Sequence, residues 1–495
     1  MPPNDPNPPK INPRRYRLTP DGLLLALLPT VGILWLSDQF RWFPLNEHKN
    51  WTVLIAVAVV CATVLLLLVW FGIGLVSRLR FQFGIRSMLV FAAVVAVVCS
   101  WFSASVRQAQ RQRKTVEEIE KKERWMSEGS VVYDYQRTAS GQTVLGGSPS
   151  APVRLRNLLG DDFFAEIVEV VVGPSPWSTE ATHIGGINDR QDPPIDAKLE
   201  RIKHLTRVEV LNLHNSMATD AGLKHIGCMT QLVELHLSQT QITDAGLEHL
   251  SGLVHLEALL LDDNRVNGDG LRHIAELHQL RKLTLSGTRV TNPGLAHLKG
   301  PGQLQLLDLG GTQVTDAGLK HIEGLHQLRE LKLAGTHVTD SGLERLKGLD
   351  QLQLLDLDGT KVTDAGLKRI EQLHQLKELT LRFTHVTDAG LEHLNRLGKL
   401  QLLDLDGTKV TGAGLERFAE ASELQTLSLQ FTRVTDAGLA NLPRRHPRLL
   451  ELSIFGSEVT QEGISTFRQA LPNCTIHIDP RQGPPGVKAS GGGFF

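Results

Sequence analysis

The sequence predicts an α/β solenoid preceded by transmembrane α-helices. The repeating unit is clearest at Leu352–Gln375, LQLLDLDGTKVTDAGLKRIEQLHQ, and near copies of these 24 residues surround it. Its first part alternates apolar and polar residues as a strand does, and Leu367, Ile370 and Leu373 then follow at helical spacing. A unit this short has one apolar face, which it can bury only by stacking on neighbouring copies. The transmembrane prediction rests on uncharged stretches within the first 106 residues.

The composition argues against several classes of protein. The chain has 495 residues, of which 41% are hydrophobic, so it is long enough for more than one domain. Its net charge of −1 and the lack of a basic stripe with interleaved aromatic residues argue against nucleic-acid binding. Four cysteines are too few for a disulfide scaffold, so the predicted fold does not depend on oxidation.

The first 106 residues contain a tail and three apolar stretches. Residues 1–20 hold seven prolines and four basic residues, which predicts a disordered basic tail. In the predicted transmembrane region, residues 21–106, the stretches 51–76 and 87–106 have 26 and 20 residues without a charge, enough to span a bilayer. The stretch 23–36 has only 14 residues, so a third span and a cleaved signal peptide are both open interpretations.

The number of spans decides on which side of the membrane the rest of the chain lies. With three spans, the side of the N-terminus carries seven Lys and Arg against six on the other side, an excess of one that favours extracytoplasmic repeats. With two spans, the side shared by both termini carries ten against three, which would place the repeats in the cytoplasm. We expect a multi-pass membrane protein, anchored in the lipid bilayer by its N-terminal helices, with extracytoplasmic repeats.

Two segments connect the membrane region to the strict repeats. Residues 107–130 combine strong helix formers with mixed charge, which predicts a solvated stalk helix; few apolar residues fall at the heptad spacing of a coiled coil. Residues 131–207 begin with the strand-like VVYDY and continue with a disguised first repeat, in which Ile167 and Val170 hold strand positions and Leu199 and Ile202 helical ones. We expect this segment to cap the first apolar edge of the solenoid.

From residue 208 to residue 478 the repeat is nearly uniform, and the Gly/Pro-rich residues 479–495 are expected to be disordered. Copies begin 24 residues apart at Val208, Leu232, Leu256, Leu280, Leu304, Leu328, Leu352, Leu376, Leu400 and Leu424, and a last one begins at Leu449. The ninth residue of each copy is Ser, Thr or Asn, which can hydrogen-bond the backbone where the chain turns off the strand. Thr363 and Asp364 supply an N-cap and a favourable charge for the helix, and Ala365 and Gly366 are small enough for close packing.

The pattern LxxLxLxxTxVTDAGLxxLxxL resembles leucine-rich repeats over about 310 residues, in the style of the cysteine-containing and ribonuclease-inhibitor-like classes. With its N-terminal spans, the whole chain resembles a bacterial-type membrane-anchored leucine-rich-repeat protein. The resemblance implies a curved solenoid with parallel strands on its concave face and helices on its convex face.

Side chains at positions 5 and 7 of each copy face the concave surface of such a solenoid. The charged ones in the central copies are Asp308, Lys332, Asp356, Asp358, Arg382, Asp404 and Asp406. Adjacent parallel strands lie about 4.8 Å apart, so two Asp pairs flank Arg382, with Lys332 beyond them. This column is either a self-neutralising ladder on a solvated sheet or a patch that recognises a protein or peptide. The carboxylates are strung out rather than gathered, so we predict no metal site.

Position 8 is usually glycine, but it is Phe383 and Phe431 in two copies. Aromatic side chains beside a polar sheet are typical interface anchors, and packing against neighbouring loops is the alternative. We therefore predict that Arg382, Phe383 and Phe431 form the binding hot spot. Histidines recur at position 18 from His225 to His321 and at His393, and we interpret them as solvated residues inherited by duplication.

The favoured hypothesis is a membrane-anchored interaction protein that binds a protein or peptide through its concave face. A structural or adhesive envelope component is the first alternative. A lesser alternative is an adaptor like the repeat domains of F-box ubiquitin-ligase receptors, although no F-box-like helical segment precedes the repeats. The sequence contains no GxSxG, Walker, HExxH or paired-cysteine metal motif, so we expect neither an enzyme nor a cofactor.

Overall fold

The computed structural model describes residues 85–122, 130–133, 167–171 and 195–478 except 206, 300, 301, 419, 420 and 422, together with 55, 57–59, 61 and 62. The predicted tails, the stretch 23–36 and most of the stretch 51–76 lie outside these residues. The chain divides into two units. One consists of Met1–Glu118 and Val132–Ile167, and the other consists of Ile119–Val131 and Val168–Phe495, which includes the solenoid.

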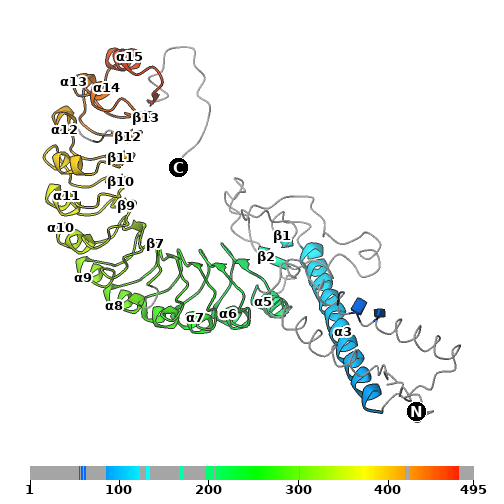
Figure 1. Cartoon of the computed structure of the whole chain (residues 1–495). Coiled ribbons are helices and arrows are strands. Elements are labelled where there is room, and N and C mark those ends of the chain that lie inside the picture. The colour runs from blue at the N-terminus through cyan, green and yellow to red at the C-terminus, as the bar shows by residue number, and fades with distance from the viewer. Residues whose placement is uncertain are drawn as a thin grey trace, which may run out of the picture. The chain divides into compact units, whose positions relative to one another are not determined.

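The long helix α3, Ile85–Lys122, contains the predicted span 87–106 and continues without a break into the predicted stalk (Figure 1). Within it, Ala92–Lys114 is long and apolar enough to cross a membrane, as judged by length and composition alone. It is the one such helix in the part of the chain that the structure describes. The predicted multi-pass arrangement therefore depends on stretches that lie outside the described residues.

The strands of the solenoid are short and regular. Apart from β1 (Ser130–Tyr133), they are β2 (Ile167–Val171), β3 (Val210–Asn212), β4 (Glu234–His236), β5 (Ala258–Leu260), β6 (Lys282–Thr284), β7 (Leu306–Asp308), β8 (Glu330–Lys332), β9 (Leu354–Asp356), β10 (Glu378–Thr380), β11 (Leu402–Asp404), β12 (Thr426–Ser428), β13 (Glu451–Ser453) and β14 (Thr475–His477). The disguised first repeat supplies β2, whose Val170 lies opposite Leu211 of β3.

Strands β2 to β14 pair in chain order, and every pair is parallel and in register. Leu355, for example, lies opposite Leu331 on one side and Leu379 on the other. Residues at equivalent positions of successive repeats therefore form continuous columns across the sheet. In the solenoid, the strands line the inner side of the arc and the helices its outer side, as the resemblance implied (Figure 1).

The outer side carries helices of one to three turns. The α-helices are α5 (Ile195–Ile202), α6 (Asp220–Ile226), α7 (Asp244–Leu247), α8 (Asn292–Leu295), α9 (Asp316–Leu319), α10 (Asp340–Leu343), α11 (Asp364–Ile370), α12 (Gly412–Arg417), α13 (Asp436–Ala440), α14 (Leu442–Arg445) and α15 (Gln461–Ala470). The 3₁₀-helices are η4 (Glu248–Leu250), η5 (Asp269–Ile274), η6 (Ala296–Lys299), η7 (Glu344–Leu346) and η8 (Gly390–Arg396).

The apolar columns of the repeat form one continuous core. In the copy that begins at Leu352, every apolar template residue is at most 1% exposed: Leu352, Leu355, Leu357, Val362, Leu367, Ile370 and Leu373. Burying each such side chain contributes about 1.5–3 kcal/mol. Because the same positions are buried in the other strict repeats, this stabilisation is spread along the whole array. At the bend after the strand, the buried hydroxyl of Thr360 donates to the carbonyl of Leu357 at 2.6 Å, which confirms the role predicted for the ninth position.

A ladder of side chains links each repeat to the next. Thr363 caps α11 as predicted, because its hydroxyl accepts a hydrogen bond from the Ala365 amide at 3.3 Å. The carboxylate of Asp364, predicted only as a favourable charge, accepts from the amide (2.8 Å) and the hydroxyl (2.6 Å) of Thr387 in the next repeat. The glycine of the TDAGL motif leaves room for this carboxylate. A Cβ on Gly390, the glycine of the next repeat, would collide with Asp364.

Candidate recognition surface

The predicted polar column lies where the strands end on the concave side. Asp356 ends β9, Thr380 ends β10 and Asp404 ends β11, and the register places Thr380 between the two carboxylates. The Thr380 hydroxyl donates to Asp356 at 2.7 Å. The backbone amides of Asp358 and Asp406 donate to Asp356 and Asp404 respectively, each at 3.0 Å. These hydrogen bonds hold the carboxylates in fixed positions along the end of the sheet.

Arg382 lies at the centre of an acidic group, which we call the Arg382 cluster: Asp358, Arg382, Asp404 and Asp406. The guanidinium Nε is 3.9 Å from a carboxylate oxygen of each of the three aspartates. These distances are at the outer limit of an ion pair, and the Arg382 side chain is 46% exposed, so each pair contributes little by itself. Three carboxylates face one guanidinium, which leaves the cluster able to accept a further cationic group.

Burial raises the pKa of three carboxylates in this column. Desolvation raises the pKa of Asp404 to about 7, and the neighbouring Asp406 and Asp358 carboxylates add to the rise; the Asp406 amide and Arg382 oppose it. Desolvation also raises the pKa of Asp358 and of Asp308 above the ordinary range of an aspartate. Asp404 therefore titrates near neutral pH instead of in the acid range of an ordinary aspartate.

Phe383 and Phe431 have backbone angles that a large side chain rarely adopts. Their φ values are 54° and 56°, in the left-handed region. In the equivalent turn of the other repeats, glycine adopts φ between 65° and 69° six times, and Asn215, Gln239 and Asp263 adopt φ between 53° and 58°. For a residue with a Cβ this conformation costs about 1–2 kcal/mol. The two residues are 58% and 54% exposed, so less than half of each is buried to offset that cost.

Each ring also packs on the following repeat. The Phe383 ring lies over the α-carbon of Gly407, and the Arg382 guanidinium is 5.8 Å from its centroid. The Phe431 ring lies over Gly456 and meets Phe455 edge-on, with a centroid separation of 5.0 Å. The rings therefore contact neighbouring loops, as the alternative interpretation expected, and still present more than half of their surface to solvent; their role as interface anchors stays a prediction.

The remaining predicted residues stay outside the Arg382 cluster. Lys332 lies opposite Asp308 and Asp356 in the register but has no ion pair with any described residue. Asp308 accepts from the Gly310 amide at 2.9 Å. Phe431 lies two repeats beyond Phe383. The structure thus joins Arg382 and Phe383 to three aspartates, and leaves Asp308, Lys332 and Phe431 as separate points on the same face.

Among the residues that the structure describes, no three His, Cys, Asp or Glu side chains are placed to hold a metal ion. The recurrent histidines from His225 to His321 are half-buried on the flanks of the outer helices. Nδ1 of His393 lies 3.6 Å from a carboxylate oxygen of Glu371. The expectation that the chain is neither an enzyme nor a cofactor protein remains a prediction.

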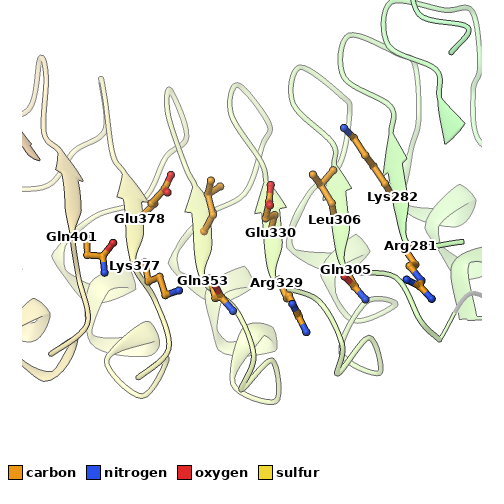
Figure 2. A pocket seen from close by; sticks show the side chains of 11 residues that line it. Arg281, Lys282, Gln305, Leu306, Arg329, Glu330, Gln353, Lys377, Glu378 and Gln401 are labelled. Atoms are coloured by element: carbon orange, nitrogen blue, oxygen red, sulfur yellow. The ribbon is translucent and has the colours of Figure 1, made fainter. Parts of the chain in front are cut away.

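A groove of about 560 Å³, which we did not predict from the sequence, lies at the opposite ends of these strands (Figure 2). One wall is the second residue of each repeat: Arg281, Gln305, Arg329, Gln353, Lys377 and Gln401. The other wall is the third residue: Lys282, Leu306, Glu330, Leu354 and Glu378. The alternation of basic residues with glutamine follows the 48-residue period of the sequence, in which LQLLDL recurs, so the signal was present.

Residues 247–475 match a family described as a leucine-rich repeat region, and residues 229–251 match a leucine-rich repeat. An internalin from Listeria monocytogenes is 18% identical, with a TM-score of 0.46, over 63% of this chain and 86% of that one. A leucine-rich-repeat protein of Leptospira interrogans is 18% identical, with a TM-score of 0.37, over 56% and 80% of the two chains. No curated protein matches the sequence.

Proposed function

The chain is a leucine-rich-repeat protein, and from that premise we propose that it is anchored in a membrane and recognises a protein or peptide through its concave face. The observation that carries the proposal is the pair Phe383 and Phe431, which adopt a costly backbone angle and yet expose most of their rings. A residue held in a disfavoured conformation indicates a functional demand at that position. Glycine occupies this turn in six other repeats and Asn215, Gln239 and Asp263 occupy it in three, so among the described residues only these two place an aromatic ring there.

Recognition by this face would combine aromatic contact with charge. Phe383 supplies exposed apolar area beside the Arg382 cluster, whose carboxylates outnumber its one cation. A lysine or arginine of the partner would pair with Asp358 and Asp404, whose side chains are 24% and 19% exposed, as its apolar neighbours cover Phe383. Contacts of this kind, with an aromatic anchor surrounded by polar groups, are typical of interface hot spots.

The substitutions Phe383→Gly and Phe431→Gly test the proposal without endangering the fold, because glycine already occupies the same turn in six other repeats. Chemical cross-linking in intact cells, followed by mass spectrometry, would identify the partner of the wild-type chain. We expect the double variant to lose that cross-linked partner. The matched control is Met217→Ser with Val254→Ser, which removes two side chains of similar exposure (70% and 51%) elsewhere in the array. Equal cross-linking of all three proteins would favour the structural or adhesive alternative.

The anchoring part of the proposal is supported by the apolar segment of α3. We further propose that the stretches 51–76 and 23–36 also span the membrane. With three spans and a cytoplasmic N-terminus, the repeats lie outside the cytoplasm. Protease accessibility of the repeats in intact cells, with a tag on each terminus, tests this topology. Cleavage only after permeabilisation would place the repeats inside and leave the adaptor hypothesis in contention.

A further inference from the structure

The groove at the strand starts presents a row of side chains in a straight line. The second residues of successive repeats are joined by backbone hydrogen bonds: the Gln353 amide donates to Arg329 and the Lys377 amide to Gln353, both at 2.7 Å. Rungs of a parallel sheet are about 4.8 Å apart, so basic residues on alternate rungs recur about every 9.6 Å. Arg281, Arg329 and Lys377 are placed in this way along one wall of the groove (Figure 2).

These cations are largely uncommitted. Arg281 is 3.6 Å from Glu257, whereas Arg329 and Lys377 form no ion pair with any residue that the structure describes. Arg329 is exposed and Lys377 is half-buried, so both are accessible from the groove. Between them, Gln305 and Gln353 each bring an amide group that can donate two hydrogen bonds. The wall therefore offers alternating cationic and neutral donors.

The opposite wall limits what the groove can accept. Leu306 and Leu354 are half-buried and present apolar surface on the rungs of the glutamines. Glu330 and Glu378 lie on the rungs of Arg329 and Lys377 and would repel an acidic group on the second side of a ligand, whereas the rung of Arg281 carries Lys282. No aromatic ring lines the groove to stack on a sugar. A peptide with one acidic side and one apolar side satisfies both walls.

The spacing of the cations selects the conformation of that peptide. A polyproline II helix has three residues per turn and rises about 3.1 Å per residue, so every third side chain points the same way at intervals of about 9.3 Å. In a β-strand, by contrast, residues three apart point to opposite sides. The polyproline II backbone forms no internal hydrogen bonds, so its carbonyls need donors such as the amides of Gln305 and Gln353.

We propose that this groove binds a polyproline II segment of a protein partner, about eight residues long, that carries an acidic residue at every third position and lies across strands β6 to β11. Its carboxylates pair with Arg281, Arg329 and Lys377, and its apolar residues contact Leu306 and Leu354. The inference rests on the proposed function, because it assigns a second contact region to the same concave face.

A designed peptide tests the register directly. The probe is fluorescent (Glu-Pro-Leu)₃, and its control contains the same nine residues with the three glutamates consecutive. Anisotropy titrations use the full chain in detergent micelles at low salt. We expect the periodic peptide to bind about tenfold more tightly, since each partly exposed ion pair contributes up to about a fivefold gain in affinity.

The variant Arg329→Gln with Lys377→Gln should abolish this preference, because it removes two of the three positive charges that pair with the peptide. Glutamine already occupies the same position on the alternate rungs, so the fold should tolerate it. The control variant Lys361→Gln with Lys409→Gln removes two exposed charges outside the groove and should keep the preference. Equal affinity for the two peptides, or a preference that survives Arg329→Gln with Lys377→Gln, overturns the inference. So does tight binding of a polyuronate when neither peptide binds, because it would assign the groove to an acidic polysaccharide. Loss of the cross-linked partner from the Phe383→Gly and Phe431→Gly variant would sustain the proposed function in any of these cases.

Discussion

The ladder between repeats predicts an energetic coupling between an aspartate and a glycine that lie 26 residues apart. Asp220, at the start of α6, accepts hydrogen bonds from the amide (2.9 Å) and the hydroxyl (2.6 Å) of Thr243 in the next repeat. One oxygen of the same carboxylate occupies the space that a Cβ on Gly246 would require. The carboxylate thus links two repeats and also determines the residue type at position 246.

The size of each effect follows from these contacts. Asp220→Ala removes two hydrogen bonds to a charged group, each contributing about 1.5–3 kcal/mol, and water replaces part of the loss at the half-buried Thr243. We expect its free energy of unfolding to fall by about 3 kcal/mol. Gly246→Ala forces an atom into a filled space, which costs about 1–3 kcal/mol in a packed region.

The double variant distinguishes this explanation from independent losses. Without the Asp220 carboxylate, the new methyl group at position 246 has room, and Leu223 Cδ1, at 3.1 Å, needs to move by only a few tenths of an ångström. The double variant should therefore cost about as much as Asp220→Ala alone. That result corresponds to a coupling of about 1–3 kcal/mol between the two sites.

Urea denaturation of the full chain in detergent, followed by circular dichroism, measures these differences when the slopes of the transitions agree. Gly324→Ala is the matched control, because a Cβ at Gly324 would meet no atom within 4 Å. Its effect should add to that of Asp220→Ala. Additive costs for Asp220→Ala and Gly246→Ala would refute the reasoning, as would a loss below about 1 kcal/mol for Asp220→Ala.

Two further predictions concern the concave face. Because the folded chain raises the pKa of Asp404 from an ordinary 3.8 to about 7, the favourable contribution of its protonated form is complete below pH 3.8 and is lost as the pH rises through 7. Asp404→Asn should therefore gain stability relative to the wild type between pH 5 and pH 8 in denaturation experiments, and a constant difference would contradict the assignment. Gly407→Ala should cost more than Gly359→Ala, because both have φ of 65° but only Gly407 lies under the Phe383 ring. The extra cost should disappear when Phe383→Gly is added, and its persistence would show that the ring is not its cause.

The sequence alone predicted the solenoid, the parallel strands and the identity of the core. It could do so because every repeat faces its neighbours in the same way, so one pattern of apolar residues describes all the interfaces. The roles of Thr360 and Thr363 were equally predictable, since a residue at a bend or a helix start bonds backbone groups within its own repeat. Alternation along a strand determines which face a side chain occupies, so the sequence could also place the charged residues at positions 5 and 7 on one face. That this face binds a partner stays a prediction.

What only the tertiary structure decided is how side chains of different repeats meet. Arg382 gathers Asp358, Asp404 and Asp406 and leaves Lys332 apart, although the spacing in sequence treats these residues alike. Asp364 crosses to Thr387 instead of serving only its own helix. These contacts depend on side-chain rotamers and on the twist between rungs, which the repeat period does not specify. The left-handed angles of Phe383 and Phe431 likewise became visible only in the folded backbone, where the turn adopts one geometry whether glycine or phenylalanine occupies it.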